Sequence, residues 1–360
     1  MIFNFLLSIF LSFLISLFLT PLVRNFFISK SWVEDPVEKQ KKTKNATALK
    51  AVPRGGGLPI YLSILITSLI FLPLDKHLIG ILLAALLTLI IGIWDDIKDI
   101  SPRLRLLTNL LSALLVVSSG IGIAYISNPF GAPIDLSFWQ LHFNFFGSHS
   151  IWVIPDLLAI VWIVWSMNIV GWSAGIEGQL PGFVSISAFF IGLLAFRYST
   201  DTTQWPVIIL AAAVSGAYLG FLPYNFFPQS IMPGYSGKSL AGFFLALLAI
   251  LSGAKLATVI LLLGIPTLDA LFVLFRRLIR RKPLTLSDGQ HLHHRMLKAG
   301  LSRRQISLLY WLFSFILGSI SLFLNSQQKL YVFLGLILVF FSLFFIFSKH
   351  TGTTPKPLRP

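Results

Sequence analysis

Long apolar runs dominate the chain, and short polar segments separate them. A membrane span needs about 20 predominantly apolar residues, and no internal repeat or Pro/Gly/Ser-rich linker divides the runs. We therefore expect an all-α fold, a polytopic transmembrane helical bundle formed by one domain over residues 1–348, with a short basic tail at 349–360. About eleven spans are predicted, over residues 2–22, 57–73, 78–94, 105–125, 151–167, 181–197, 205–222, 239–253, 256–275, 306–323 and 330–348.

The composition supports this interpretation. The 360 residues are 56% hydrophobic and 11% charged, with a mean hydropathy of +0.83, whereas soluble domains are about 25% charged. The first run lacks a basic start and a small-residue cleavage site, so it is expected to be a retained span and not a signal peptide. The chain has no cysteine, which removes disulfides, thiolate metal sites and cysteine nucleophiles from consideration.

The distribution of basic residues predicts the orientation. If the N-terminus lies outside, 24 of the 28 Lys and Arg fall on the inner side, and only Lys76, Arg197, Lys255 and Lys329 remain outside. This asymmetry predicts an outside N-terminus and a cytoplasmic C-terminus. The net charge of +15 lies in loops between spans, where it favours anionic headgroups and phosphates and not nucleic acid. The outer loop 126–150 carries turn signals that predict a small hairpin.

Three carboxylates lie between two apolar runs, at Asp95, Asp96 and Asp99. One helical turn would bring them to the same side, and acids at the edge of a span usually face a partner, a cation or water. Mg²⁺ takes one or two carboxylates and completes its shell with water and phosphate. The alternative is a solvated loop cap that the bases at positions 98, 103 and 105 neutralise.

Two further inner segments carry polar residues among glycines. Arg54, inside Pro-Arg-Gly-Gly-Gly, could pair with a phosphate while glycine amides approach the anion; the alternative is a flexible turn beside lipid headgroups. Asn168 and Glu177 lie in an apolar, glycine-rich stretch, residues 165–182. Glu177 has no nearby base in the sequence, so it is either a second ligand or an exposed side chain.

The remaining inner segments are basic. Lys238 follows glycines and precedes a serine, but the spacing is not that of a P-loop. Asp288, His291, His293, His294 and Arg295 fall within eight residues, a pattern that suits contacts to a diphosphate or a metal–phosphate complex. Zinc is the rival ligand, although no second pair of ligands completes such a site. Asp269, which precedes an arginine run, is expected to pair with an arginine.

Taken in order, these motifs resemble those of the polyprenyl-phosphate N-acetylhexosamine-1-phosphate transferases, a family of glycosyltransferase 4 type that includes phospho-N-acetylmuramoyl-pentapeptide transferase. The resemblance covers about residues 20–310, and the His-x-His-His form is similar to the N-acetylglucosamine-phosphate branch. It depends on Pro53-Arg54-Gly55-Gly56-Gly57, Trp94-Asp95-Asp96, Pro102-Arg103-Leu104, Asn168 with Gly175 and Gly178, Pro223-Tyr224-Asn225-Phe226, Pro266 with Asp269 and Arg277, and Asp288 with His291-Leu292-His293-His294-Arg295.

The resemblance implies a cleft in the bacterial cytoplasmic (inner) membrane that faces the cytoplasm and depends on Mg²⁺ or Mn²⁺. There a polyprenyl phosphate attacks the β-phosphate of a UDP-sugar, giving a lipid-diphosphate sugar and UMP for envelope glycan synthesis. Membrane lipids are the other expected partners, a homodimer is an open arrangement, and no nucleic acid is expected. Asp95 and Asp96 would be the catalytic, metal-binding pair. The expected phosphate or nucleotide contacts are Arg54, Asn168, Glu177, Lys238, Asp288, His291, His293, His294 and Arg295.

The chain departs from the family's acidic motifs. Where the family has Asn-x-x-Asn-x-x-Asp-Gly-x-Asp-Gly, this chain has Gly171, Ala174 and Glu177 at the second Asn and the two Asp positions. Tyr235 stands where the family has a metal-binding Asp, and a phenol stays protonated at neutral pH. Our leading hypothesis is a rebuilt site in which Asp95, Asp96 and Glu177 hold the metal and Lys238 replaces part of its charge. A catalytically silent relative that binds polyprenyl phosphate or nucleotide-sugar, and a transporter or flippase, are the alternatives.

Overall fold

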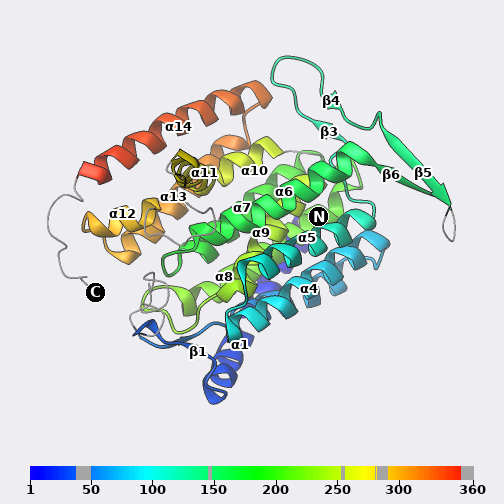
Figure 1. Cartoon of the computed structure of the whole chain (residues 1–360). Coiled ribbons are helices and arrows are strands. Elements are labelled where there is room, and N and C mark those ends of the chain that lie inside the picture. Colours follow the sequence, from blue (N-terminus) through cyan, green and yellow to red (C-terminus); the bar gives the residue numbers. More distant parts are fainter. Residues whose placement is uncertain (38–49, 145–147, 253–255, 280, 282–290, 350–360) are drawn as a thin grey trace.

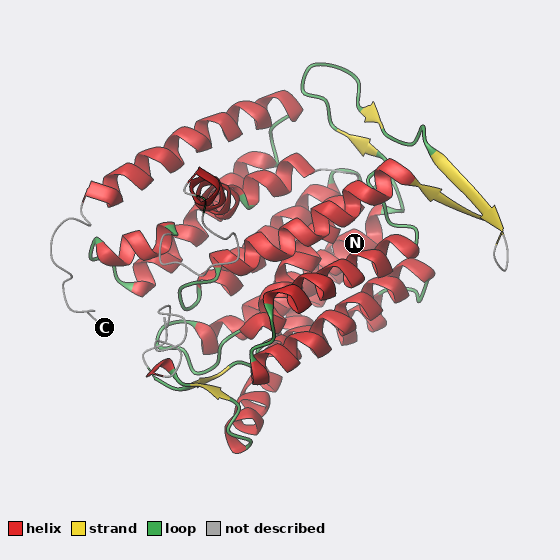
Figure 2. Cartoon of the chain, in the orientation of Figure 1, coloured by secondary structure: helices red, strands yellow, loops and turns green. Residues whose placement is uncertain are grey.

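The structure is a computed structural model that describes residues 1–37, 50–144, 148–252, 256–279, 281 and 291–349. Helices account for most of it, and short two-stranded sheets lie at the periphery (Figures 1 and 2). The helices are α1 (Ile2–Ser29), α3 (Gly57–Phe71), α4 (Lys76–Lys98), α5 (Pro102–Ser118), α6 (Val153–Ser173), α7 (Gln179–Phe196), α8 (Gln204–Asn225), α9 (Gly234–Leu251), α10 (Leu256–Leu262), α11 (Gly264–Ile279), α12 (Leu292–Lys298), α13 (Arg303–Ser321) and α14 (Ser326–Lys349). The strands are β1 (Val33–Glu34), β2 (Val52–Pro53), β3 (Tyr125–Ile126), β4 (Ile134–Asp135), β5 (Gln140–Asn144) and β6 (Ser148–Trp152).

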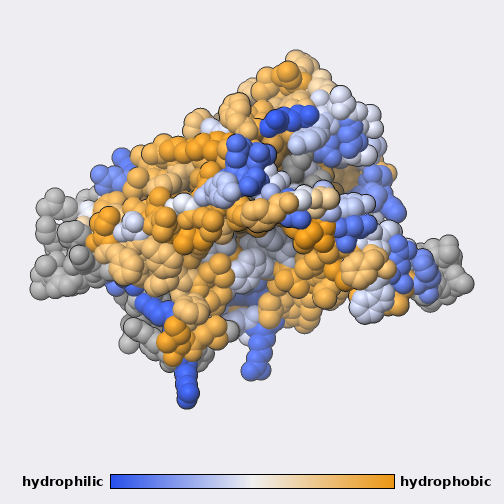
Figure 3. All heavy atoms as spheres, turned by 90° about the horizontal axis from the view of Figure 1, so that it is seen from above, coloured by the Kyte–Doolittle hydropathy of each residue, from blue (hydrophilic) through white to orange (hydrophobic). Residues whose placement is uncertain are grey.

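The chain is a multi-pass membrane protein. Within the described residues, seven helices are long and apolar enough to cross a membrane, and an eighth span is counted if α10 and α11 form one. Each of the eleven predicted segments does contain a helix, but α3 has 15 residues and α5 has 17, short of the length used for the prediction. Apolar side chains cover much of the face seen in Figure 3, as expected for a surface in contact with lipid.

The packing of α1 shows how small residues bring helices together in a membrane. Its buried positions Ser8, Ser12, Ser16 and Thr20 repeat every fourth residue and so form one stripe. A Cβ added to Gly216 of α8 would lie 2.2 Å from a backbone carbonyl oxygen of α1, so only glycine permits this approach. Ser12 Oγ also donates a 2.6 Å hydrogen bond to a carbonyl of α8. Close backbone contact and interhelical hydrogen bonds replace the hydrophobic driving force that lipid removes.

The bundle has two distinct ends. At one end, called here the hairpin end, β5 and β6 pair in antiparallel fashion and lead into α6 (Figure 1), so the hairpin predicted in loop 126–150 is confirmed. At the other end, called here the site end, α4, α6, α8 and α14 finish and α7 and α9 begin. Helix α1 starts beside Phe196 at the hairpin end, whereas α14 ends beside Arg295 at the site end.

The predicted span 256–275 is not one straight helix. It is divided into α10 and α11, whose axes differ by 79°; Figure 1 shows α11 almost end-on while α10 runs along the bundle. Helix α11 is amphipathic, with Asp269 and Arg277 buried and Leu271, Phe275, Leu278 and Ile279 exposed. A hydropathy run records apolarity but not direction, so the sequence could not show this bend.

Candidate active site

Asp96 connects α4 to the first turn of α9. Its carboxylate accepts hydrogen bonds from the Tyr235 backbone N–H (2.5 Å) and from the Ser236 hydroxyl (2.5 Å). Gly234 begins α9 with φ 66°, and a Cβ there would lie 2.3 Å from an Asp96 oxygen. A carboxylate on exposed N–H groups at a helix N-terminus is favourable, so Asp96 serves as an N-terminal cap supplied from another helix.

Asp95 lies on the same turn and contacts arginines. Its Oδ1 accepts a 2.7 Å bond from Arg105 Nε and a 3.1 Å bond from a backbone N–H after α4. Its Oδ2 is buried, has no hydrogen-bond partner among the described residues, and lies 3.6 Å from Arg54 Nη2. The α-helical spacing predicted from the sequence therefore does gather the acids, and guanidinium groups are their counter-charges in the part of the chain that the structure describes.

Arg54 reaches this site from β2. Arg54 follows the last residue of this strand, which pairs with β1. Two residues later, the Gly56 backbone N–H donates a 3.1 Å hydrogen bond to the Met232 carbonyl just before α9. Arg54 lies within 4 Å of four acids: Asp99 (2.6 Å), Glu34 (3.4 Å), Asp95 (3.6 Å) and Asp96 (3.7 Å). Burial alone would lower the pKa of its guanidinium, but the surrounding carboxylates raise that pKa above its ordinary value. We call these four acids with Arg54 and Arg105 the acidic cluster.

Tyr235 lies beside the paired aspartates and adds no charge to them. Its hydroxyl donates to Asn109 Oδ1 at 3.0 Å, and the Arg105 guanidinium lies 5.1 Å from its ring centroid, a cation–π distance. Asn109 is buried on α5. Neither Asn109 nor Ser236 stood out in the sequence, because a lone small polar residue in an apolar helix carries no local signal of its partner.

Glu177 is neither exposed nor without a base. Its two carboxylate oxygens both lie 2.7 Å from Arg303 Nη1, at the start of α13, and Gln229 Nε2 lies at 3.5 Å. Both charged side chains are less than a tenth exposed. Its backbone carbonyl also accepts from Ser307. The alternative of an exposed side chain is therefore wrong, and a role as a ligand stays a prediction. Glu177 holds the turn before α7 against Arg303 of α13, 126 residues away in sequence.

Asn168, the other residue predicted in that stretch, makes a local contact. Its amide donates to the Val164 carbonyl of its own helix at 2.7 Å. A phosphate contact from Asn168 stays a prediction.

The histidines gather at the start of α12. His291 Nδ1 lies 2.9 Å from Asp269 Oδ2, and the other Asp269 oxygen accepts the Leu292 backbone N–H at 2.8 Å. The prediction that Asp269 pairs with an arginine is therefore wrong: among the described residues its side-chain partner is His291, which follows the arginine run in the sequence. The His291 and His293 rings are stacked with centroids 5.7 Å apart, and the His293 and His294 centroids are 4.3 Å apart. We call His291, His293 and His294 the histidine cluster.

His293 is the buried member of this cluster. It is 1% exposed, and its Nδ1 has no hydrogen-bond partner among the described residues. A Cβ on Gly175 would lie 2.0 Å from its Nε2, so glycine leaves the space that the ring occupies. Burial, followed by the charges of His294, His291 and Lys238, holds the pKa of His293 well below its ordinary value. Lys238, in the first two turns of α9, therefore lies near enough for its charge to act on the histidine cluster.

The last two predicted residues give no further geometry of the site. Arg295 places its guanidinium 4.0 Å from the centroid of the Phe344 ring on α14. Asp288 lies outside the described residues.

The residues present do not fit a resident divalent metal ion. In the part of the chain that the structure describes, no three His, Asp or Glu side chains are grouped to hold one. Both Asp96 oxygens already accept bonds from α9, and two guanidinium groups lie against Asp95. Mg²⁺ requires near-octahedral oxygen ligands, and arginines at this distance would repel it. Glu177 contributes to a separate ion pair, so the predicted grouping of Asp95, Asp96 and Glu177 around an ion is not seen.

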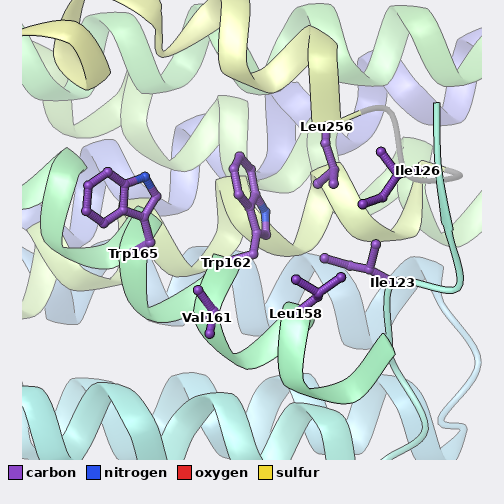
Figure 4. A pocket seen from close by; sticks show the side chains of 7 residues that line it. All are labelled: Ile123, Ile126, Leu158, Val161, Trp162, Trp165 and Leu256. Atoms are coloured by element: carbon purple, nitrogen blue, oxygen red, sulfur yellow. The ribbon is translucent and has the colours of Figure 1, made fainter. Parts of the chain in front are cut away.

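An apolar pocket lies elsewhere, on α6. Figure 4 shows the Trp162 and Trp165 rings on one side of it and Leu256 of α10 across from Leu158. Trp162 Nε1 donates to a carbonyl of α9 (3.2 Å). The lining has no titratable group, so we assign it no chemistry. The lining residues are Ile123, Ile126, Leu158, Val161, Trp162, Trp165 and Leu256.

The comparisons with known proteins support the family resemblance. The family model described as glycosyl transferase family 4 matches residues 78–253, a region that holds the paired aspartates of α4 and the start of α9. A probable undecaprenyl-phosphate N-acetylglucosaminyl 1-phosphate transferase of Bacillus subtilis is 27% identical over 352 residues, which cover 95% of this chain and 90% of that protein.

Two other relatives have related names. A decaprenyl-phosphate N-acetylglucosaminephosphotransferase of Mycobacterium leprae is 26% identical over 321 residues, covering 80% of this chain and 77% of that protein. A phospho-N-acetylmuramoyl-pentapeptide-transferase of Chlamydia pneumoniae is 28% identical over 282 residues, covering 75% of this chain and 80% of that protein. The similarity thus extends over most of each chain.

Proposed function

We propose, from the match to glycosyl transferase family 4 over residues 78–253 and from the relatives that the chain resembles along most of its length, that it transfers a sugar 1-phosphate from a UDP-sugar to polyprenyl phosphate. N-acetylhexosamine 1-phosphate is the first candidate. An oxygen of the lipid phosphate attacks the β-phosphorus of the UDP-sugar. The bond from that phosphorus to the bridging oxygen breaks, and UMP leaves with the bridging oxygen. The product is a lipid-diphosphate sugar for the cell envelope.

The observation that carries this proposal is the position of the first turns of α9. Asp96 bonds to the Tyr235 and Ser236 amides on one side, and Lys238 faces the histidine cluster on another. An acidic cluster and a basic, histidine-rich cluster thus border the same helix end. Phosphoryl transfer is mostly positioning and charge neutralisation, which a site with one polar region on each side of a helix N-terminus can provide.

We assign the diphosphate to the side of the histidine cluster. Lys238 and the histidines provide donors and positive charge there, and His293 is held neutral in a buried position. The lipid phosphate then approaches from the α4 side, where Asp95 and Asp96 fix Arg54 and Arg105. Because the acidic cluster does not fit a resident ion, no step here runs through Mg²⁺ or Mn²⁺.

We propose that the site end faces the cytoplasm of a bacterial inner membrane. The support is the basic-residue count: 24 of 28 Lys and Arg belong to segments on that side. A cytoplasmic nucleotide-sugar would meet the site directly in this orientation. UMP would return to the same compartment.

The test is incorporation of radiolabel from UDP-N-acetylglucosamine into the lipid fraction of membranes that contain the protein, with equimolar UMP release. His77→Gln is a matched control because His77 lies in the first turn of α4, at the opposite end of that helix from Asp95 and Asp96. It is expected to retain most turnover, whereas His293→Gln is expected to lose it. Failure to release UMP from any UDP-sugar while polyprenyl phosphate is present would contradict the proposal.

A second function is favoured by one specific observation. Arginines partly neutralise the acidic cluster, and a tyrosine stands at the position where the resemblance places an aspartate. Both features suit a relative that binds polyprenyl phosphate or nucleotide-sugar without turnover. Saturable binding of UDP-sugar with no UMP release would select it. Transport is the third candidate, and flux of labelled lipid across vesicles without UMP release would identify it.

A further inference from the structure

Arg54 occupies the centre of the acidic cluster. Its three nitrogens lie within 4 Å of carboxylates from two places in the chain, Glu34 of β1 and the three acids at the end of α4. Its side chain is 11% exposed, and those of Asp95 and Asp96 are fully buried. A planar guanidinium with a fork of five donors can bridge several acids in a way that a lysine ammonium cannot.

The charges in this cluster need an internal cation. Among the described residues, four carboxylates face two guanidinium groups, those of Arg54 and Arg105. A buried carboxylate without a counter-charge is strongly unfavourable, and the two fully buried acids each have Arg54 within 3.7 Å. The Arg54 guanidinium therefore provides these two acids with the positive charge that a bound cation would otherwise provide.

Tyr235 is consistent with this arrangement. A carboxylate at its position would add a fifth negative charge to a cluster in which the described carboxylates already outnumber the guanidinium groups. The phenol instead donates to Asn109 and lies beside the Arg105 guanidinium. It thereby holds Arg105 against Asp95 without adding charge.

We infer that Arg54 is a built-in counter-cation that takes the place of a divalent metal ion between Asp95 and Asp96, and that its removal would open a divalent-cation site there. The wild-type cluster then binds no Mg²⁺ or Mn²⁺ of its own. This inference concerns ion binding alone and does not depend on transferase activity.

The test is titration of the purified full chain in detergent with Mn²⁺, followed by electron paramagnetic resonance of the free ion, without nucleotide or lipid. We compare wild type, Arg54→Gln, Arg54→Lys and Asp95→Asn. Wild type and Arg54→Lys are expected to bind no Mn²⁺ at the acidic cluster, so their titrations should match that of Asp95→Asn. Arg54→Gln is expected to bind one Mn²⁺ per chain, roughly a hundredfold more tightly than the weakest binding that the wild-type titration could detect, because one adjacent positive charge has been removed.

Two results would overturn the inference. One is a wild-type chain that binds Mn²⁺ at a site that Asp95→Asn abolishes. The other is a folded Arg54→Gln chain, judged by its gel-filtration profile, that gains no ion. If Arg54→Gln cannot be recovered folded, the wild-type titration alone decides: Asp95-dependent Mn²⁺ contradicts the counter-cation, and its absence supports it.

Discussion

The buried ion pair between Glu177 and Arg303 allows a quantitative test of how the turn before α7 is held. Arg303 Nη1 lies 2.7 Å from both carboxylate oxygens, and the side chains are 4% and 7% exposed. Water cannot replace either partner at that burial. Removal of one charge therefore leaves the other uncompensated, which costs about 3–5 kcal/mol.

This cost can be converted into a melting temperature. At about 2.1 cal/mol/K of unfolding entropy per residue, 360 residues give roughly 0.8 kcal/mol/K, so Glu177→Gln should lower the unfolding midpoint by about 4–7 °C. The measurement is tryptophan fluorescence during heating in detergent. Glu177→Gln combined with Arg303→Met removes both charges, and it should recover at least half of the loss if the two side chains act as a pair.

Two outcomes would refute this reasoning. The first is a Glu177→Gln midpoint within about 1 °C of wild type, far below the range expected for a broken buried pair. The second is a wild-type chain that Mg²⁺ stabilises and a Glu177→Gln chain that it does not, since that pattern would make Glu177 a metal ligand.

Three other predictions concern the histidine cluster and the orientation. Gly175→Ala should displace the His293 ring, because the new Cβ would lie 2.0 Å from Nε2, and destabilise the chain by about 1–3 kcal/mol; a midpoint and a UDP-sugar affinity equal to wild type would contradict the close contact. The pKa of His293 in the folded chain lies well below its ordinary value. As the pH falls, His293 is therefore protonated first in the unfolded chain. The free energy of unfolding should be unaffected by this residue above pH about 6.5 and should decline by about 1.4 kcal/mol per pH unit below it. Melting curves from pH 7.5 to 5 check this, and an unchanged slope in His293→Gln would contradict it. In the cysteine-free chain, Ser137→Cys near the hairpin should react with an impermeant maleimide from outside intact cells and Ala299→Cys should not; the reverse labelling would invert the proposed orientation.

The apolar pattern predicted the helices well because it is a local property. A run of apolar residues must be helical in a membrane, since every backbone group needs an internal partner there. The pattern also brought Asp95, Asp96 and Asp99 together correctly, because three or four residues make one helical turn.

The partners of the site residues could not be predicted in the same way. Ser236 lies 140 residues from Asp96, and Arg303 lies 126 residues from Glu177. Pairs so distant in sequence depend on which helices pack together, and the hydropathy of each helix does not record that choice. Gly175 is a similar case, since its role becomes visible only when the His293 ring is seen against it.

The bent helix α11 has a mechanical consequence for the histidines. Its outer face exposes Phe275, Leu278 and Ile279, while Asp269 on its inner face holds His291 and the first amide of α12. The position of a helix that lies across the bundle is more sensitive to the thickness of the bilayer than that of an upright span. A thinner or thicker bilayer would change the tilt of α11. Because Asp269 is bonded to the start of α12, that change of tilt would move α12. The distance between the histidine cluster and Lys238 would then depend on bilayer thickness.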